Sequence, residues 1–233
     1  MLKNFPNIKV IAFDADDTLW ENENFFREAE QEFYALMENY ADKDFLEQKL
    51  FQTEIGHLSL YGYGIKSFIL SMIETALKVS KNEVSQEIIL EILQIGKRML
   101  NHPVRLLKGV ESTLKLLSEK NYRLVVATKG DLLDQERKLK QSGLQKYFHH
   151  IEVMTDKQGS NYKSLFQNLA VKPSEFLMIG NSLKSDILPI LKLGGQAIHI
   201  PYHTTWVHES LNEEDLKQHQ YFKLESLEGL IEQ

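Results

Sequence analysis

The sequence predicts a doubly wound α/β protein, in which a parallel sheet is flanked by helices and an all-helical domain is inserted after the first strand. Two observations predict this class. The second half of the chain alternates short apolar strands with helical patterns of about ten residues, which is typical of crossover units and a parallel sheet. The stretch between Asn22 and Asn101 instead shows only helical periodicity.

The first strand lies in an apolar, β-branched run that starts at Ile8. An isolated strand would leave its backbone groups unpaired, so this strand has to join the later sheet. The insert ends at the helix break His102-Pro103 and carries about four amphipathic patterns. We therefore expect an α/β core of residues 1–20 and 104–233 and a helical cap of residues 21–103. The helical patterns of the insert lie near residues 33–40, 45–51, 69–77 and 88–99.

The later strands are expected where apolar runs are bounded by polar or turn residues. The helices between them follow from 3.6-residue periodicity, and the last of them should begin at Ser185 or Asp186. A short strand at 221–223 and a final helix at 225–231 complete this Rossmann-like arrangement. The expected strands are 123–127, 150–154, 176–180 and 196–200, and the expected helices are 110–117, 132–141, 162–169 and a helix ending near residue 193.

Composition excludes several classes of protein. The chain is 42% hydrophobic and 26% charged with a net charge of −6, which is typical of a globular protein and argues against a nucleic-acid partner. The first residues lack a signal-peptide pattern and no apolar run could span a bilayer, so we expect a cytoplasmic protein without a membrane partner. The absence of cysteine excludes disulfides, thiolate metal sites and a cysteine nucleophile. Monomer and homodimer remain open.

Carboxylates follow the first strand directly. Asp14 and Asp16 are two residues apart, so on an extended backbone they project to the same side. Two close carboxylates repel each other unless a cation or a proton lies between them. A hard cation such as Mg²⁺ would resolve this conflict, whereas the alternative for an isolated DxDD motif is a solvated acidic turn.

The other expected strands also end in polar residues. Thr128 follows the second strand, Lys157 follows the third, and the fourth leads into Asn181 and Asp186. Because the carboxyl ends of parallel strands meet at one edge of the sheet, these residues are expected to converge. Four polar strand ends are harder to explain as solvated loops than one.

These four motifs resemble those of the haloacid dehalogenase-like hydrolases, specifically the phosphatase branch, in the order DxDxT, T, K and GDSxxxD. Residues 13–19 (FDADDTL) are similar to the first motif, and Thr128 is similar to the second. Asn181-Ser182 with Asp186 is similar to the fourth motif. The helical insert is similar to the family's cap, which lies between the first two motifs.

The resemblance implies a Mg²⁺-dependent phosphatase of a small phosphorylated metabolite. Asp14 would be the nucleophile that forms an aspartyl-phosphate, and Asp16 would be the general acid and then the general base. Thr128 and Lys157 would bind the phosphoryl oxygens.

The metal ligands implied are Asp14, the backbone carbonyl of Asp16, and Asp186. Asn181 stands where the family usually has Asp. An amide oxygen can still act as a ligand but brings no charge, so we expect weaker metal binding.

Several residues stay open. Lys163 is an alternative to Lys157, which we favour because it directly follows a strand, and Lys129 could add positive charge. Asp17 is expected either to be solvated or to bond locally within the turn. Two further sets are weaker: a zinc site at His199, His203 and His208 is disfavoured for want of acidic partners, and Trp20, Asn22 and Glu23 are hypothesised to line the pocket mouth.

Three rival functions remain. A haloacid dehalogenase would also use the first Asp, but it expels halide and needs neither a leaving-group acid nor a metal, so Asp16 and Asp186 count against it. A phosphomutase would share Asp14 and Asp16. A catalytically silent binding protein would have no need of the intact motif positions.

Overall fold

The computed structural model of the protein describes residues 2–120, 122–204, 206–209, 211, 216 and 219–231. The chain divides into two compact units, each of which is built from separate stretches of sequence. The α/β unit contains Met1–Glu23, Val104–Lys129 and Gln135–Gln233, and the helical unit contains Asn24–Pro103 and Gly130–Asp134.

The α/β unit is built on a six-stranded parallel sheet with the order β3-β2-β1-β4-β5-β6, which confirms the predicted fold class. β1 lies in the interior of the sheet, and its residue Ile11 is in register with Leu124 of β2 and Leu177 of β4. Successive strands add on one side of β1 and then on the other, so the strand order reverses between β1 and β4. Ligands of open α/β sheets bind at such a switch point. The strands are β1 (Val10–Phe13), β2 (Arg123–Lys129), β3 (His150–Met154), β4 (Phe176–Gly180), β5 (Gln196–His199) and β6 (Phe222–Lys223).

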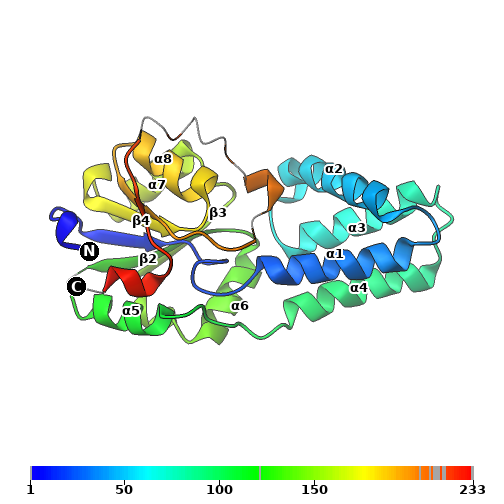
Figure 1. Ribbon diagram of the computed structural model, residues 1–233, viewed down its shortest axis with the longest axis horizontal. Coiled ribbons are helices and arrows are strands. Elements are labelled where there is room, and N and C mark those ends of the chain that lie inside the picture. The colour runs from blue at the N-terminus through cyan, green and yellow to red at the C-terminus, as the bar shows by residue number, and fades with distance from the viewer. Residues whose placement is uncertain are drawn as a thin grey trace. The chain divides into compact units, whose positions relative to one another are not determined.

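Helices cover both faces of the sheet (Figure 1). The two-residue alternation of strand side chains places Ile11 and Phe13 in the core beneath α5, and Val10 and Ala12 in the core beneath α7 and α8. Burial on both faces explains why these strands read as continuous apolar runs. The helices of this unit are α5 (Val110–Ser118), α7 (Gly159–Leu169), α8 (Leu188–Lys192) and, from Gln135 onward, α6 (Leu132–Ser142).

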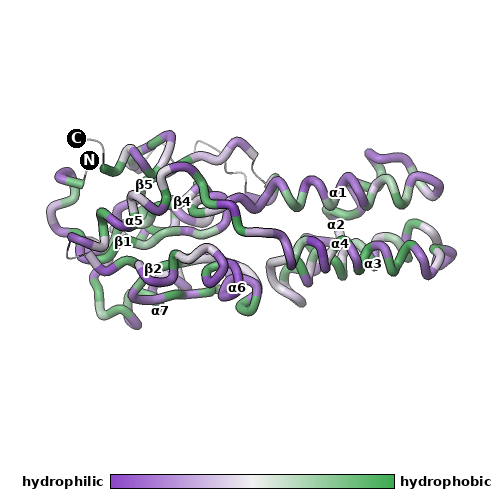
Figure 2. Tube along the Cα trace, turned by 90° about the horizontal axis from the view of Figure 1, so that it is seen from below, coloured by the Kyte–Doolittle hydropathy of each residue, from purple (hydrophilic) through white to green (hydrophobic). Residues whose placement is uncertain are grey.

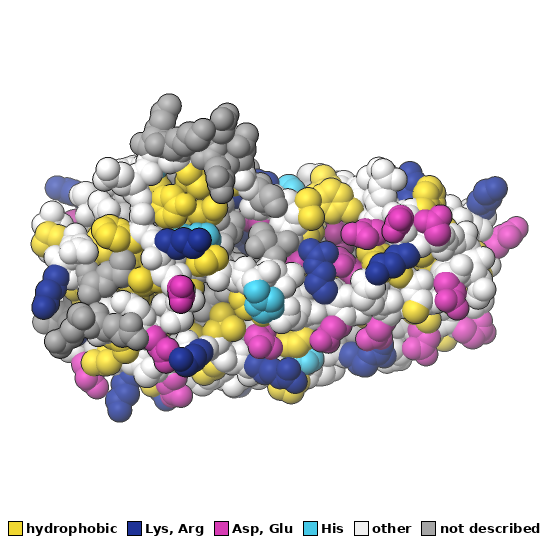
Figure 3. Space-filling view, in the orientation of Figure 1, with side chains coloured by type: hydrophobic (Ala, Val, Ile, Leu, Met, Phe, Trp, Pro, Cys, Tyr) yellow, Lys and Arg dark blue, Asp and Glu magenta, His cyan; other side chains and the backbone are white. Residues whose placement is uncertain are grey.

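The helical unit has a hydrophobic core of its own, in which Phe33, Met72 and Ile92 are fully buried. Side-chain caps fix the starts of two of its helices: Asp42 accepts a hydrogen bond from the Phe45 amide at 2.9 Å, and Ser85 caps the last helix in the same way. Hydrophobic and hydrophilic residues alternate along these helices (Figure 2), and charges of both signs are interspersed on the face seen in Figure 3. The helices are α1 (Glu23–Met37), α2 (Lys43–Tyr61), α3 (Ile65–Val79) and α4 (Gln86–Leu100).

Two helices of the insert have other bounds than expected: α1 begins at Glu23 and not near residue 33, and α2 continues to Tyr61 and not only to residue 51. Three further segments also differ from the sequence-based expectation. The helix expected from residue 185 begins earlier, as a π-helix at Leu183–Ile187 that leads into α8. The expected final helix is a 3₁₀ turn, Leu227–Leu230. Gly130–Asp134, which the sequence assigns to the core, groups with the helical unit, where Asp131 pairs with Lys66 at 2.8 Å.

In the part of the chain that the structure describes, no helix has the length and apolar character needed to cross a membrane.

Candidate active site

The carboxyl end of β1 carries a buried carboxylate. The Asp14 amide donates to the carbonyl of Ile179 at 2.9 Å, which extends the pairing of β1 with β4 by one residue. The Asp14 side chain is thereby held at the switch point, and only 7% of the residue is exposed. The Thr18 hydroxyl donates to Asp14 Oδ2 at 3.2 Å and lies 3.4 Å from Asn181 Oδ1. Thr18 therefore connects the first motif to the loop after β4.

Lys157, in the loop after β3, brings the most distant parts of the site together. Its Nζ donates to Asp14 Oδ1 and, at 2.6 Å, to Asp186 Oδ1. All three side chains are buried. The alternative lysine, Lys163, is exposed on α7.

Burial and charge compete at this cluster. Burial raises the pKa of Asp14 most strongly; the ammonium of Lys157 opposes this effect and the carboxylate of Asp186 adds to it, so that the pKa rises to about 7. For Lys157, burial lowers the pKa, but the two carboxylates outweigh it and raise the pKa to about 12. Two carboxylates thus share one ammonium, and the cluster favours an additional positive charge.

The π-helix positions Asp186. The Ile187 amide donates to the Ser182 carbonyl at 3.3 Å, five residues back, which widens the turn. Asp186 Oδ2 accepts from the Ser182 amide at 3.0 Å. The carboxylate lies so close to β4 that a Cβ atom on Gly180 would be 2.2 Å from Oδ2. Only glycine fits at this strand end while Asp186 keeps its position. π-helical turns are rare and occur frequently at functional sites.

Asp16 is held by three side chains that the sequence analysis did not single out for this role. Its Oδ1 accepts from Trp20 Nε1 at 2.7 Å and from Lys138 Nζ at 2.9 Å, and its Oδ2 accepts from Gln135 Nε2 at 2.8 Å. Lys138 also donates to Asn22 Oδ1 at 2.7 Å. Gln135 and Lys138 are three residues apart on α6, so they lie on one face of that helix. Helical periodicity predicts such pairs but does not identify what they contact.

Asp17 has a structural role that the sequence did not reveal. Its backbone has a positive φ of 61°, and its carboxylate accepts hydrogen bonds from the amides of Asn22 and Glu23, at the start of α1. Burial and the nearby charge of Asp16 raise the pKa of Asp17 to about 8, against the effect of these two hydrogen bonds. Asp17 therefore fixes the path by which the chain leaves β1 and enters α1.

Thr128, Lys129 and His199 were also singled out from the sequence, and each makes contacts with residues other than Asp14 and Asp186. Thr128 is buried at the end of β2, and its hydroxyl donates to the Lys129 carbonyl at 3.3 Å. Lys129 pairs with Glu209 at 2.5 Å. His199 Nε2 lies 2.9 Å from the Asn181 carbonyl oxygen. Among the described residues, no three His, Asp or Glu side chains are grouped as a metal site.

The donor set at the switch point nevertheless suits a hard cation. Asp14 and Asp186 are two buried carboxylates that both reach Lys157 Nζ, so they lie close together. When both are ionised, they carry one more negative charge than that ammonium balances. Mg²⁺ is commonly bound through one or two carboxylates together with water and substrate oxygens. Asp14 and Asp186 therefore fit a magnesium ion.

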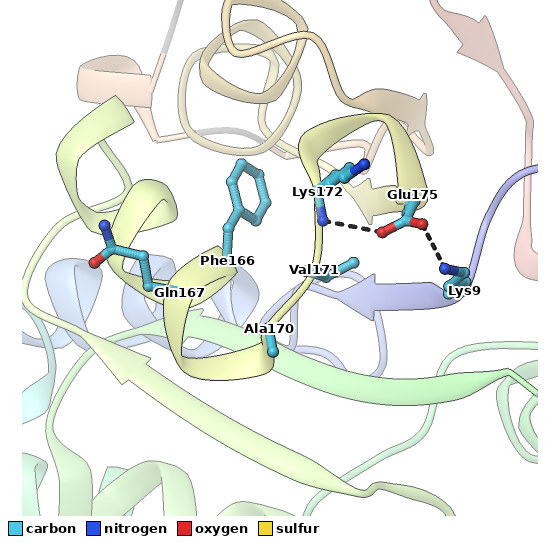
Figure 4. A pocket seen from close by; sticks show the side chains of 7 residues that line it. All are labelled: Lys9, Phe166, Gln167, Ala170, Val171, Lys172 and Glu175. Atoms are coloured by element: carbon cyan, nitrogen blue, oxygen red, sulfur yellow. Dashed lines mark hydrogen bonds and ion pairs between the residues drawn. The ribbon is translucent and has the colours of Figure 1, made fainter.

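An open depression of about 540 Å³ lies at the other edge of the sheet (Figure 4). Lys9 precedes β1 and Glu175 precedes β4, so the depression lies at the amino ends of these strands. The two side chains pair with each other at 2.5 Å, and the Lys172 amide donates to Glu175 at 3.1 Å. This depression is separate from the cluster around Asp14. Its lining residues are Lys9, Phe166, Gln167, Ala170, Val171, Lys172 and Glu175.

Solved structures with the same fold include a phosphatase and haloacid dehalogenases. A putative hydrolase from Bacillus subtilis bound to magnesium is 19% identical with a TM-score of 0.63, covering 96% of this chain and 97% of that chain. The L-2-haloacid dehalogenase from Xanthobacter autotrophicus is 13% identical with a TM-score of 0.60, covering 96% of each chain. These two likenesses concern the fold alone.

A stronger likeness is to a haloacid dehalogenase-like family hydrolase from Xanthomonas campestris. It is 38% identical with a TM-score of 0.80, and the alignment covers 86% of this chain and 84% of that chain. A comparison with curated proteins gave no match. The family described as haloacid dehalogenase-like hydrolase matches residues 8–194, most of the chain. From this match and the 38% identical hydrolase, we conclude that the chain belongs to the haloacid dehalogenase-like hydrolases.

Proposed function

We propose that the protein is a magnesium-dependent phosphatase of a small phosphorylated metabolite, which acts through an aspartyl-phosphate on Asp14. The observation that carries this proposal is the combination of two further carboxylates with Asp14. Asp16 follows Asp14 by two residues, and Asp186 shares Lys157 with Asp14. Displacement of a halide needs neither an acid for the leaving group nor a metal-binding carboxylate. Hydrolysis of a phosphate ester benefits from both.

In the first step, a carboxylate oxygen of Asp14 attacks phosphorus and the bond from phosphorus to the ester oxygen breaks. Asp16 gives its proton to the leaving alcohol. In the second step, Asp16 takes a proton from water, the water oxygen attacks phosphorus, and the Asp14 carboxylate and inorganic phosphate are released. Splitting the hydrolysis in this way replaces one difficult displacement by two easier ones.

The other residues hold the phosphoryl group. Lys157 is within reach of Asp14, so its ammonium can bind a phosphoryl oxygen next to the nucleophile, and Thr128 supplies a hydroxyl at the end of the neighbouring strand. Thr18 braces Asp14 through its hydrogen bond to Oδ2. Asp14, Asp186 and the backbone carbonyl of Asp16 would hold Mg²⁺, with the amide oxygen of Asn181 as a weaker ligand. When bound, this ion supplies positive charge that reduces the repulsion between Asp14 and the phosphoryl oxygens.

The magnesium-bound hydrolase from Bacillus subtilis, which shares the fold, supports the choice of metal. The haloacid dehalogenases of the same fold make release of halide the alternative function. A phosphomutase would transfer the phosphoryl group to a second substrate and would not release it to water.

The proposal is tested by measuring release of inorganic phosphate from p-nitrophenyl phosphate and a panel of metabolites, with Mg²⁺ and with a chelator. Release of chloride from 2-chloropropionate is measured in parallel. We expect phosphate release that requires Mg²⁺ and is abolished in Asp14→Asn. Chloride release that persists with the chelator would establish the dehalogenase instead. Activity that survives Asp14→Asn would exclude the nucleophile, and no release of either product would favour a silent binding protein.

A further inference from the structure

Glu209 is a carboxylate near the site that the proposed reaction does not use. It ends a 3₁₀ turn, Val207–Glu209, which lies between β5 and β6 and outside the four motifs. Only 13% of its side chain is exposed. A carboxylate that is largely removed from solvent needs charged or hydrogen-bonding partners.

Glu209 receives hydrogen bonds from two separate segments, the end of β2 and the stretch after β4. Its Oε1 accepts from Lys129 Nζ at 2.5 Å. Its Oε2 accepts from the hydroxyls of Ser182 and Ser185 at 2.6 and 2.5 Å. Lys129 also donates to the Ser185 hydroxyl at 2.9 Å, and the Ser185 amide donates to the Ser182 hydroxyl at 3.0 Å. One carboxylate thereby links the end of β2 to the loop after β4.

Both segments carry residues of the proposed reaction. Lys129 directly follows Thr128, and the two serines precede or lie within the π-helix that contains Asp186. The Ser182 amide donates to Asp186 Oδ2, so the chain of contacts runs from Glu209 through Ser182 to Asp186. A π-helical turn is rare, and contacts from outside the turn can hold it in one conformation.

The charges of Glu209 and Lys129 are consistent with a role of Glu209 in linking β2 to the stretch after β4. Burial tends to raise the pKa of Glu209, but the Lys129 ammonium and the three hydrogen bonds outweigh it and lower the pKa to about 2. Glu209 is thus ionised at neutral pH and neutralises Lys129. Lys129 is therefore committed to this network, although the sequence suggested it as an additional positive charge for the substrate.

We infer that Glu209 is a positioning residue, which fixes the π-helical turn bearing Asp186 relative to the end of β2. This inference rests on the proposed function, because it assigns Glu209 to the support of a metal-binding carboxylate. Partners that orient metal ligands in this way typically change metal affinity by about 10- to 100-fold when they are removed.

The test compares the wild type with Glu209→Gln and Glu209→Ala. Glu175→Gln is the matched control, because Glu175 also pairs with a lysine at 2.5 Å but at the opposite edge of the sheet. Mg²⁺ affinity is measured by calorimetric titration without substrate, at a temperature at which each variant is folded by circular dichroism. We expect about tenfold weaker Mg²⁺ binding in Glu209→Ala, a smaller loss in Glu209→Gln, and wild-type affinity in Glu175→Gln.

A merely structural role would lower the melting temperature and leave Mg²⁺ affinity unchanged, and that result would overturn the inference. If Glu209→Ala does not fold, Ser185→Ala takes its place, since it removes two hydrogen bonds of the same network, the one from Ser185 to Glu209 and the one from Lys129 to Ser185. The titration needs no substrate. A wild type that binds Mg²⁺ but releases no phosphate would therefore refute the phosphatase, while the Glu209 comparison still decides this inference.

Discussion

At the scale of single residues, the arrangement around Asp16 has the clearest consequence for catalysis. The proposed proton carrier is tied to Trp20, Gln135 and Lys138, with 23% of its side chain exposed. A general acid must lie within hydrogen-bond reach of the leaving group, and a displacement of about 1 Å can reduce the rate greatly. The partners of Asp16 are therefore expected to affect the rate through the position of this carboxylate.

Replacing Lys138 by Met removes the charged partner of Asp16 and keeps a side chain of similar length. We expect kcat to fall by about tenfold, because Asp16 loses one of the three side chains that hold its carboxylate in position. Steady-state kinetics with p-nitrophenyl phosphate provide the measurement. Lys140→Met is the control, since Lys140 is exposed on the same helix. Equal kcat values in the two variants would show that Lys138 does not position Asp16.

The ionised state of Glu209 predicts a pH-dependent contribution to stability. Its pKa in the folded protein is about 2, against 4.5 for an ordinary glutamate, so the contribution is present above pH 4.5 and is lost as the pH falls toward 2. At pH 7 we expect Glu209→Gln to be less stable than the wild type by about 2–3 kcal/mol, with the difference shrinking below about pH 5. Urea unfolding of both proteins between pH 7 and acidic pH measures this difference in the free energy of unfolding. A difference in stability that is independent of pH would contradict the conclusion that Glu209 is ionised in the folded protein.

Among individual residues, those that the sequence could indicate are the ones that directly follow strands. Asp14, Lys157 and Asp186 were expected to converge because parallel strand ends share an edge, and the structure brings them together. Lys138 was not found, since periodicity does not say which polar residue of a helix meets which loop. Glu209 was not found because its segment has no regular pattern and makes its contacts across long sequence distances.

At the scale of elements, the π-helix after β4 determines the position of Asp186. The five-residue spacing of the Ile187 to Ser182 hydrogen bond widens the turn and brings the carboxylate against the backbone of Gly180. The sequence predicted a helix here but placed its start two or three residues late. An amphipathic pattern does not distinguish a π-helical start from an α-helical one.

Gly180→Ala would place a Cβ atom 2.2 Å from Asp186 Oδ2. The conflict can be relieved only by moving the carboxylate or the strand end, so we expect a loss of about 1–3 kcal/mol of stability together with most of the phosphatase activity. Chemical denaturation and kcat are measured for this variant. Gly159→Ala is the control, because a Cβ atom there meets nothing within 4 Å. A Gly180→Ala variant with wild-type activity would show that Asp186 need not occupy this position.

At the scale of the whole molecule, the chain has two units with separate hydrophobic cores. The alternation of strands and helices predicted the sheet, and the purely helical stretch predicted the insert. The sequence did not predict that Gly130–Asp134 would group with the helical unit, since that depends on contacts such as the pair of Lys66 with Asp131. Such contacts join residues that no local pattern connects.

Separate cores predict separate responses to mutation. Met72 is fully buried in the helical unit, and Met72→Ala should cost about 2–5 kcal/mol there through lost burial and the cavity left behind. Hydrogen exchange measured by mass spectrometry should show faster exchange in α1–α4 and unchanged protection of β1 and β4. An equal increase in both units would mean that the chain opens as a single cooperative structure.

The central claim, that Asp14 is the nucleophile of a phosphatase, is tested most directly by identifying the covalent intermediate. Asp16→Asn should slow the second step, because the general base is lost, so the intermediate should accumulate with a substrate such as p-nitrophenyl phosphate, whose leaving group needs little protonation. After acid quenching and proteolysis, mass spectrometry should find one phosphoryl group on the peptide that contains Asp14, and none in the double variant Asp14→Asn, Asp16→Asn. A phosphoryl group on another residue, or phosphate release without any phosphorylated peptide, would contradict the proposed mechanism.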